Sequence, residues 1–329
     1  MLPKVELHVH LDCCLSYEVV ASLRPTITLE QYRQNFIAPK RCTNLADFLT
    51  RAPKGVELMQ TEHALRLVTS DLFKQFKADG VIYTEIRFAP LLHCDEGLEA
   101  ADVVRIVDEA VDEGIAETGV EARIILCTLR HFTAQQSMTT VELVEQYNGT
   151  RVVALDIAGD EAGYPIDAHV EAFEYAKRRN CFRTAHAGEA RGVESVWETL
   201  RNFEPQRIGH GVRSLEDPAL VRHLKERQIH LEVCPSSNLQ TNIYGEISGH
   251  PVDRLFKAGV SVGINTDART ITDTTLGNEY RLLSDAFGWT KSHFLKCNLD
   301  AVRAAFVPEA VKAALMFRLE SGYAIEAPE

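Results

Sequence analysis

Short, mainly apolar segments alternate with longer amphipathic segments along the chain. The apolar segments have the length and the β-branched residues typical of buried strands, whereas the amphipathic ones repeat apolar residues at helical spacing. The pattern predicts eight strands, over residues 4–11, 81–89, 121–129, 152–158, 183–187, 207–210, 230–234 and 260–266. It predicts helices between them over 62–79, 101–118, 166–179, 192–202, 216–228 and 250–259, with Ser214 as the N-cap of the fifth.

Eight successive strand–helix units predict an α/β fold of the (β/α)8 type, a TIM barrel. Parallel strands joined by right-handed crossovers close into a barrel at that number. A doubly wound open sheet is the alternative, but it usually has fewer strands and a glycine-rich first turn, which this chain lacks. Because no linker or low-complexity segment interrupts the sequence, we expect residues 1–329 to form a single barrel domain.

A helical insertion is expected after the first strand. The first two strands begin 81 − 4 = 77 residues apart, whereas later strands begin 23 to 40 residues apart. One helix and its loops need about 30 residues, so about 40 are surplus, near residues 15–60. This segment has helical patterns at 28–37 and 44–51 and follows a strand, where loops cover the active-site face of a barrel. We interpret it as a lid; an insertion without a role is the alternative.

The first strand separates apolar from polar residues. The apolar residues at odd positions 5–11 point one way, and Glu6, His8 and His10 point the other, which we expect to be the barrel interior. Two imidazoles on one face of a strand suit zinc, iron or nickel. The alternative is that both are polar residues satisfied within the protein.

Further polar residues end other predicted strands. His186 ends the fifth, His210 ends the sixth and Asp267 follows the eighth. Strand ends converge in a barrel, so three His and one Asp could hold a catalytic zinc ion with a place left for water, whose pKa the metal lowers toward neutrality. Glu189 follows His186 after a flexible Ala-Gly pair and could act as an acid or base beside the metal. A solvated loop carboxylate is the alternative for Glu189.

Seven stretches occur in the order and spacing of one known family: KVELHVHLD, ILCTL followed by RHF, DIAGDE, TAHAGE, RIGHG, HLEVCPSSN and GINTDA. From Lys4 to about Pro308 the chain resembles the adenosine deaminase family. The resemblance implies an amidohydrolase-type barrel with one zinc ion per chain, or another divalent transition metal. It also implies hydrolytic deamination of adenosine and 2′-deoxyadenosine to inosine and deoxyinosine, with release of ammonia.

The resemblance also implies roles for particular residues. The metal ligands would be His8, His10, His186 and Asp267. His210 would orient the attacking water and help its deprotonation, and Glu189 would protonate the purine nitrogen next to the reacting carbon.

Substrate contacts follow from the same motifs. The backbone of Gly159 would lie against the purine edge, where the absence of a Cβ permits close approach. Asp12 and His131 would meet the ribose hydroxyls at the 5′ end, and Glu232 would hold His210. The alternatives are a helix-capping role for Asp12 and a surface loop position for His131.

Two positions depart from the family pattern. Many members have a second Asp after the metal ligand, which bonds the purine N7; this chain has Ala268, followed by Arg269. Cys13 stands where the family usually has Gly. Other 6-aminopurines therefore stay open as substrates: adenine, an N6-modified nucleotide, or a 5′-extended nucleoside such as aminodeoxyfutalosine.

Two other functions are less consistent with these residues. A purine-binding protein with degraded catalysis would not need all six catalytic and metal-site residues intact. An amidohydrolase that cleaves esters or amides usually has two metals bridged by a Lys on the fourth strand, and residues 152–158 contain no Lys.

Composition limits the partners. Lys plus Arg total 35 and Asp plus Glu total 47, so the net charge of −12 argues against nucleic acid and anionic membranes. No apolar run of about 18 residues is present, and the charged N-terminus does not resemble a secretory signal. The eight cysteines form no CxxC pair, which favours reduced thiols in the cytoplasm.

We expect a small purine nucleoside as the partner and leave the oligomeric state open. Cys127 and Cys234 are interpreted as core thiols, and the histidines outside the predicted site, His250 among them, as structural.

Overall fold

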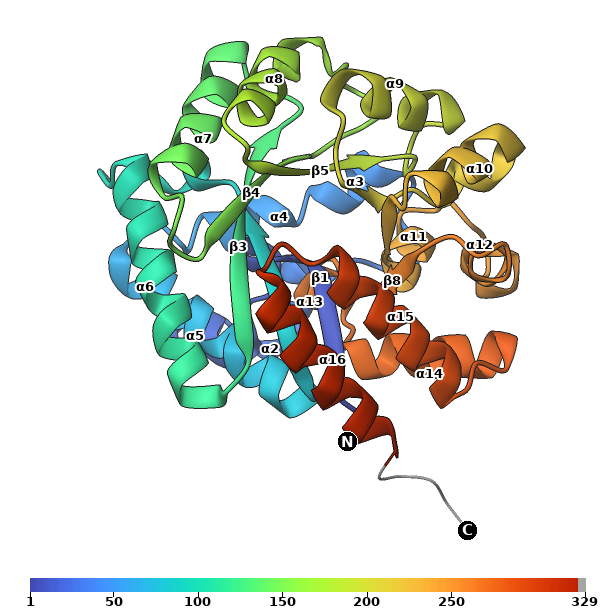
Figure 1. The fold of residues 1–329 in the computed structure, drawn as a ribbon. Helices are drawn as coiled ribbons and strands as arrows, with labels where there is room; N and C mark the ends of the chain where they lie inside the picture. Colours follow the sequence, from blue (N-terminus) through green and yellow to red (C-terminus); the bar gives the residue numbers. More distant parts are fainter. Residues whose placement is uncertain (325–329) are drawn as a thin grey trace.

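Eight parallel strands in chain order form the centre of the computed structural model, which describes residues 1–324 (Figure 1). Each strand pairs in parallel with the next. The predicted (β/α)8 barrel is therefore confirmed. The strands are β1 (Lys4–His10), β2 (Val81–Phe88), β3 (Glu121–Leu129), β4 (Val152–Ala158), β5 (Phe182–Ala187), β6 (Arg207–His210), β7 (His230–Val233) and β8 (Val262–Ile264).

Helices surround the strands on the outside (Figure 1). Their ends have local causes: α5 and α6 both end at a glycine in the left-handed conformation, Gly80 and Gly119, within two residues of the next strand. After β1 to β7 the helices are α5 (Glu62–Asp79), α6 (Ala100–Thr118), α7 (Ala134–Gln146), α8 (Val170–Arg178), α9 (Val193–Phe203), α10 (Pro218–Glu226), α11 (Pro235–Gln240) and α12 (Val252–Lys257). After β8 they are α13 (Arg269–Thr272), α14 (Leu276–Phe287), α15 (Lys291–Ala304) and α16 (Glu309–Ala324).

The expected N-cap of α10 is wrong. Asp217 caps this helix, with its side chain accepting a hydrogen bond from the backbone N–H of Ala219 at 2.8 Å. Pro218 follows at the first helical position, where its missing N–H costs nothing. Ser214 instead lies buried within the 3₁₀ segment Val212–Glu216.

The barrel closes between β8 and β1. The backbone of Asp267 accepts from the N–H of His10 at 2.8 Å and donates to the carbonyl of His8 at 3.0 Å. Deeper in the barrel a side chain replaces the ladder: the Asn265 amide oxygen accepts from the backbone N–H groups of Leu7 at 2.7 Å and His8 at 3.1 Å. Closure of this seam therefore uses one buried side-chain amide in addition to backbone hydrogen bonds.

One residue of β1 does not follow the expected alternation. Glu6, predicted to face the interior with the two histidines, instead bonds Thr266 and Arg269. The Arg269 guanidinium in turn lies over the ring of Phe76 in α5, on the helical side. The pairing of β1 with β2 is irregular between Glu6 and Val9, so strict alternation does not extend across this point.

The link between α15 and α16 covers the amino-terminal end of the barrel and passes in front of the strands in Figure 1. The backbone N–H of Phe306 donates to Glu85 at 2.7 Å, and the Arg207 guanidinium stacks 3.8 Å from the centre of the Phe306 ring. The chain thus covers the charged interior of the barrel from this side.

Four short helices follow β1 within the expected insertion: α1 (Tyr17–Leu23), α2 (Leu29–Phe36), α3 (Leu45–Leu49) and α4 (Ala52–Val56). In Figure 1, α3 and α4 lie behind the strands, on the side away from α16. Backbone hydrogen bonds of 2.8 Å tie Ala38 to Ile271 and Cys42 to Gln240. Gly55 lets α4 approach the turn after β1, since a Cβ there would lie 2.1 Å from the Asp12 carbonyl oxygen. The segment is therefore fastened to loops on the carboxyl side of the barrel.

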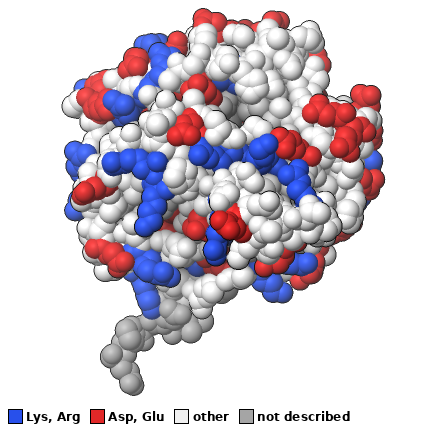
Figure 2. Space-filling view, turned by 180° about the vertical axis from the view of Figure 1, so that it is seen from behind, with Lys and Arg blue, Asp and Glu red and all other residues white. Residues whose placement is uncertain are grey.

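Figure 2 shows the face opposite to that of Figure 1. Lys and Arg side chains form a row across its middle, with acidic side chains on both sides. Within residues 1–324, no helix has the length and apolar character needed to cross a membrane.

We predict that Asn265→Ala weakens the barrel seam. Two buried N–H groups lose their acceptor, which should lower the free energy of unfolding by about 2–4 kcal/mol. Urea unfolding of the purified variant measures the change. Asn148→Ala, at an exposed position, is the control and should change stability by less than about 0.5 kcal/mol. Equal stability of both variants would contradict the role given to Asn265.

Candidate active site

Four of the predicted residues converge at the carboxyl ends of the strands. His8 and His10 from β1, His186 from β5 and Asp267 after β8 offer ligand atoms that all lie within 4.8 Å of one another. Nε2 of His10 lies 3.2 Å from Nε2 of His186. Nε2 of His8 is buried without a hydrogen-bond partner among residues 1–324, although Asp267 Oδ1 lies 3.2 Å away. Ring nitrogens that converge on one point, one of them buried without a partner among the described residues, fit a bound cation, and this donor set suits zinc.

Buried carboxylates fix the orientation of two of these imidazoles. His8 Nδ1 lies 2.9 Å from Glu232 Oε2, and His186 Nδ1 lies 3.1 Å from Asp156 Oδ2. A carboxylate accepts the proton on Nδ1, which leaves the lone pair of Nε2 directed at the centre of the cluster. Both rings are thus held in the tautomer that a metal ligand requires.

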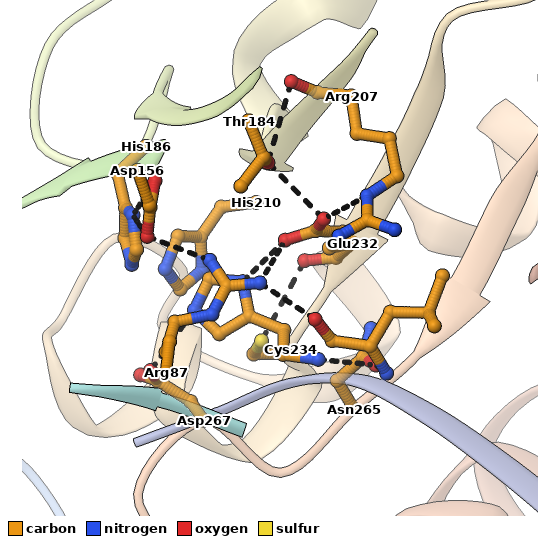
Figure 3. A network of polar contacts seen from close by, with 12 residues as sticks. Arg87, Asp156, Thr184, His186, Arg207, His210, Glu232, Cys234, Asn265 and Asp267 are labelled. Atoms are coloured by element: carbon orange, nitrogen blue, oxygen red, sulfur yellow. Dashed lines mark hydrogen bonds and ion pairs between the residues drawn. The ribbon is translucent and has the colours of Figure 1, made fainter. Parts of the chain in front are cut away.

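The expectation that Glu232 holds His210 is wrong. Its carboxylate binds His8, and two guanidiniums draw it into the barrel: Arg87 at 2.7 Å and Arg207 at 2.6 Å (Figure 3). His210 instead has its Nδ1 3.1 Å from the side-chain amide nitrogen of Asn238.

A chain of buried charges lies beside the cluster in the barrel interior (Figure 3). Arg87 joins Glu232 to Asp156, with 2.9 Å to the latter, and Arg207 joins Glu232 to Glu85 at 2.6 Å. All five side chains are fully buried. Although burial opposes it, the two arginines hold the pKa of Glu232 well below its usual range. Our sequence reasoning missed Glu85, Arg87 and Asp156, whose signal was charge at inward-facing positions of otherwise apolar strands.

Two residues at strand ends adopt the left-handed conformation that non-glycine residues seldom adopt. His210 has φ 60° and Asp267 has φ 67°. Such backbone costs free energy and persists where its surroundings hold it in place. For Asp267 these include the hydroxyl of Ser237, which donates to Oδ2 at 2.7 Å.

Glu189 lies at the same centre and is not a member of the ligand cluster. Its Oε1 is buried and has no hydrogen-bond partner in the part of the chain that the structure describes, and its Oε2 lies 3.5 Å from His210 Nε2. Burial raises the pKa of Glu189 well above its usual range, and the negative charges of Asp267 and Glu161 add to the effect. The carboxyl group is therefore suited to carry a proton at neutral pH and to donate it.

Glu161 holds the loop that carries Glu189. Its carboxylate accepts from four consecutive backbone N–H groups at 2.6–2.9 Å and from the Ser195 hydroxyl at 2.6 Å. The four N–H groups belong to Gly188, Glu189, Ala190 and Arg191. Glu161 is part of the DIAGDE stretch, but its partners lie far along the chain, so our sequence reasoning did not identify it.

A cavity of about 460 Å³ opens over the cluster, between the strand ends and the insertion. Four carboxylates line it, those of Asp12, Asp160, Glu189 and Asp267. Among its lining residues in the described part of the chain, there is no Lys or Arg. His131, Gly159 and Ala268, predicted to meet the substrate, also line this cavity.

The structure places Asp12 at the cavity, within the 3₁₀ segment Leu11–Cys13 and not at the N-cap of a helix. Ser16 caps α1 by accepting from the backbone N–H of Val19, so the capping alternative for Asp12 is wrong. Asp12 is buried, which raises its pKa to about 6. The Cys13 thiol donates to its Oδ1 at 3.5 Å, a weak hydrogen bond. The carboxylate thus keeps acceptor capacity for a ligand.

The other two predicted contacts differ in setting. His131 is an exposed residue, next to the ring of Phe132. Gly159 has φ 100°, which a side chain would disfavour. A Cβ at Gly159 would meet Arg130 only at an ordinary 3.5 Å, so the backbone conformation, and not crowding by the protein, selects glycine here.

The wall at Ala268 is apolar. Ala268 is buried in a cluster with Leu45, Phe48 and Ile271, and Cys13 packs against it. Arg269 does not line the cavity; it pairs with Glu6 and Asp79. It therefore does not replace the Asp that many family members have at this point.

Cys234, interpreted as a core thiol, is buried but lies at the cluster. Its sulfur falls within 4.8 Å of ligand atoms of His8, His210 and Asp267. Burial raises the pKa of this thiol well above its usual value, so the group stays protonated.

A parallel eight-stranded barrel with a His and Asp metal-binding cluster at its carboxyl end defines a TIM-barrel hydrolase of the amidohydrolase type. A family model described as adenosine deaminase matches residues 3–321. The adenosine deaminase of Clostridium acetobutylicum is 34% identical over 326 residues, which cover 97% of each chain. The chain belongs to the adenosine deaminase family, as its motifs indicated, and it is a hydrolase of that family.

Solved structures share the fold at lower identity. An adenine deaminase from Arthrobacter aurescens superposes with a TM-score of 0.90 at 24% identity, covering 98% of this chain and 99% of its own. An amidohydrolase from Burkholderia ambifaria with bound zinc superposes with a TM-score of 0.89 at 20% identity, covering 98% of this chain and 91% of its own. The Arabidopsis N6-mAMP deaminase superposes with a TM-score of 0.85 at 24% identity, covering 97% of this chain and 98% of its own.

We predict that Glu161→Gln loosens the loop that carries Glu189. The Gln side chain has one acceptor oxygen instead of two, and its NH2 group would face backbone N–H groups, which cannot accept a hydrogen bond. The free energy of unfolding should fall by about 2–4 kcal/mol, and turnover should fall about 10- to 100-fold at full metal loading. Urea unfolding and steady-state kinetics check this.

The matched control is Glu198→Gln. This side chain lies near the same loop, but among the described residues it bonds only the partly exposed Arg191, at 2.9 Å. Its stability should change by less than about 0.5 kcal/mol. Equal behaviour of the two variants would show that Glu161 does not hold the loop.

Proposed function

We propose that the protein is a zinc-dependent aminohydrolase that converts adenosine and 2′-deoxyadenosine to inosine and deoxyinosine. The observation that carries the proposal is the buried Glu189 carboxyl group beside a cluster of three His and one Asp. Its Oε1 accepts no hydrogen bond from the described residues. The amidohydrolase from Burkholderia ambifaria, which shares this fold and has bound zinc, supports the choice of metal. Zinc bound by His8, His10, His186 and Asp267 would lower the pKa of water and supply a nucleophile near neutral pH.

The residues of this chain then divide the remaining work. Glu189 gives its proton to the purine ring nitrogen next to C6, which makes that carbon more electrophilic. Water adds to C6, the bond from C6 to the amino nitrogen breaks, and the amino group leaves as ammonia. One proton of the water leaves with the ammonia and the other restores Glu189, so adenosine and water give inosine and ammonia. Glu232 and Asp156 keep His8 and His186 in their ligand tautomers throughout. The insertion narrows the cavity over these groups.

The lining of the cavity favours a nucleoside over a nucleotide. A 5′-phosphate would enter a space lined by four carboxylates, with no Lys or Arg among the described lining residues. Asp12 has spare acceptor capacity in a buried position, which suits ribose hydroxyl groups and gives an advantage over free adenine. We place Asp12 and His131 at the ribose and Gly159 at the purine edge.

A second candidate substrate is an uncharged 5′-extended nucleoside. His131 is exposed and also lines the cavity, so an extension beyond the ribose could reach solvent there. The apolar wall at Ala268 lacks the N7 contact of many relatives, which weakens the preference for one purine over another.

Glu189→Gln separates proton donation from metal binding. We expect this variant to keep its metal and its fold, yet to lose about 10²- to 10⁴-fold in kcat, because the amide has no acidic proton to give. His10→Ala should instead lose metal, as measured by elemental analysis. Near wild-type turnover in Glu189→Gln would exclude the assignment, and full metal content in His10→Ala would exclude His10 as a ligand.

Asp12→Asn tests the substrate. Losing a hydrogen bond to a charged group should lower kcat/KM for adenosine about 10- to 100-fold. The value for adenine, which has no ribose, should not change. The panel also includes 2′-deoxyadenosine, AMP and a 5′-extended nucleoside. Adenosine should rank above adenine and AMP in the wild type; a higher rank for adenine would favour a nucleobase deaminase.

A further inference from the structure

Asn238, in α11, lies buried between two histidines. Its side-chain amide nitrogen is 3.1 Å from His210 Nδ1, and its amide oxygen is 3.2 Å from His250 Nε2. The other ring nitrogen of His250 accepts from the backbone N–H of Val252 at 3.2 Å. Four groups thus form one continuous line from the start of α12 to the candidate active site.

The direction of every hydrogen bond in this line follows from its far end. A backbone amide can only donate, so His250 Nδ1 must be unprotonated. Burial, with the nearby charge of Arg254, lowers the pKa of His250 to about 3, so the ring is neutral and its proton is on Nε2.

The remaining two links are then determined. Nε2–H of His250 donates to the oxygen of Asn238, so the Asn238 amide nitrogen must face His210 and donate to its Nδ1. Neutral His210 therefore carries its proton on Nε2, the atom that lies 3.5 Å from Glu189 Oε2. A backbone amide outside the cavity determines the tautomer of a ring inside it.

We propose that His250 and Asn238 are positioning residues that hold His210 in the tautomer protonated at Nε2. Neither side chain lines the cavity, and both are at most 1% exposed, so they reach the reaction only through His210. Histidine function depends on which nitrogen carries the proton, and a neighbouring hydrogen bond makes that choice.

The consequence concerns what His210 does in the reaction. Its Nε2 presents an N–H and not a lone pair, so neutral His210 donates a hydrogen bond to the oxygen that attacks C6 and orients it. It does not take the proton of that oxygen, because its unprotonated ring nitrogen, Nδ1, already accepts a hydrogen bond from Asn238. This catalytic part rests on the proposed function; the tautomer itself does not.

The first test uses the wild-type, metal-loaded chain without substrate. Nitrogen-15 NMR of ring-labelled histidines distinguishes protonated from unprotonated ring nitrogens, and the His210 signals are identified by their loss in His210→Gln. We expect a protonated Nε2 and an unprotonated Nδ1. A protonated Nδ1 would overturn the proposal, whatever substrate the enzyme prefers.

Asn238→Asp reverses the last link, because a carboxylate accepts from Nδ1–H. The NMR signature of His210 should change to a protonated Nδ1, and kcat should fall about 10- to 100-fold while KM and metal content stay near wild type. An unchanged signature with unchanged kcat would refute the role of Asn238. An altered signature with unchanged kcat would refute the catalytic consequence.

His250→Ala and His250→Gln form a matched pair, since Gln can still donate to the Asn238 oxygen. We expect Ala to give mixed tautomer signals with a lower kcat, and Gln to restore both. His230→Ala is the control, because His230 is also fully buried and neutral but bonds Ser261, not Asn238. It should leave the His210 signals unchanged. The same loss of signature in His230→Ala would point to general destabilisation and overturn the assignment.

Discussion

The barrel closes at a seam whose residues are also the candidate metal ligands. Backbone hydrogen bonds of Asp267 to His8 and His10 join β8 to β1, and the side chains of the same three residues form most of the ligand cluster. A cation bound there would connect the last strand to the first. Barrel closure and the ligand cluster therefore depend on the same residues. Asn265 contributes to closure by accepting hydrogen bonds from the backbone N–H groups of Leu7 and His8.

Beneath the seam, the barrel interior is charged where many proteins would be apolar. Burying Glu232 and Asp156 costs free energy that their ion pairs with Arg87 and Arg207 offset. The arrangement does more than neutralise charge, because each carboxylate also accepts the Nδ1 proton of a ligand histidine. A purely apolar interior would leave those rings free to turn or to change tautomer.

Hydrogen-bond direction, and not only position, is the second property that the surroundings impose on the site. Glu161 gathers four backbone N–H groups around the loop of Glu189, and its negative charge also helps to keep that carboxyl protonated. In the same way, Asn238 and His250 determine which ring nitrogen of His210 carries the proton. The proposed acid and the proposed hydrogen-bond donor are thus both held by their surroundings in this structure, which contains no substrate.

The sequence by itself determined the barrel, the order of its strands and the residues that gather at their ends, because these follow from local periodicity and short motifs such as HVH and HAGE. It did not decide which carboxylate meets which imidazole. Glu232 was expected at His210 and lies at His8, Glu6 leaves the inward face, and the bond between His250 and Asn238 was not predicted. Such pairings join residues far apart in the chain, and the close packing of the barrel interior selects among them by distances that no local pattern contains.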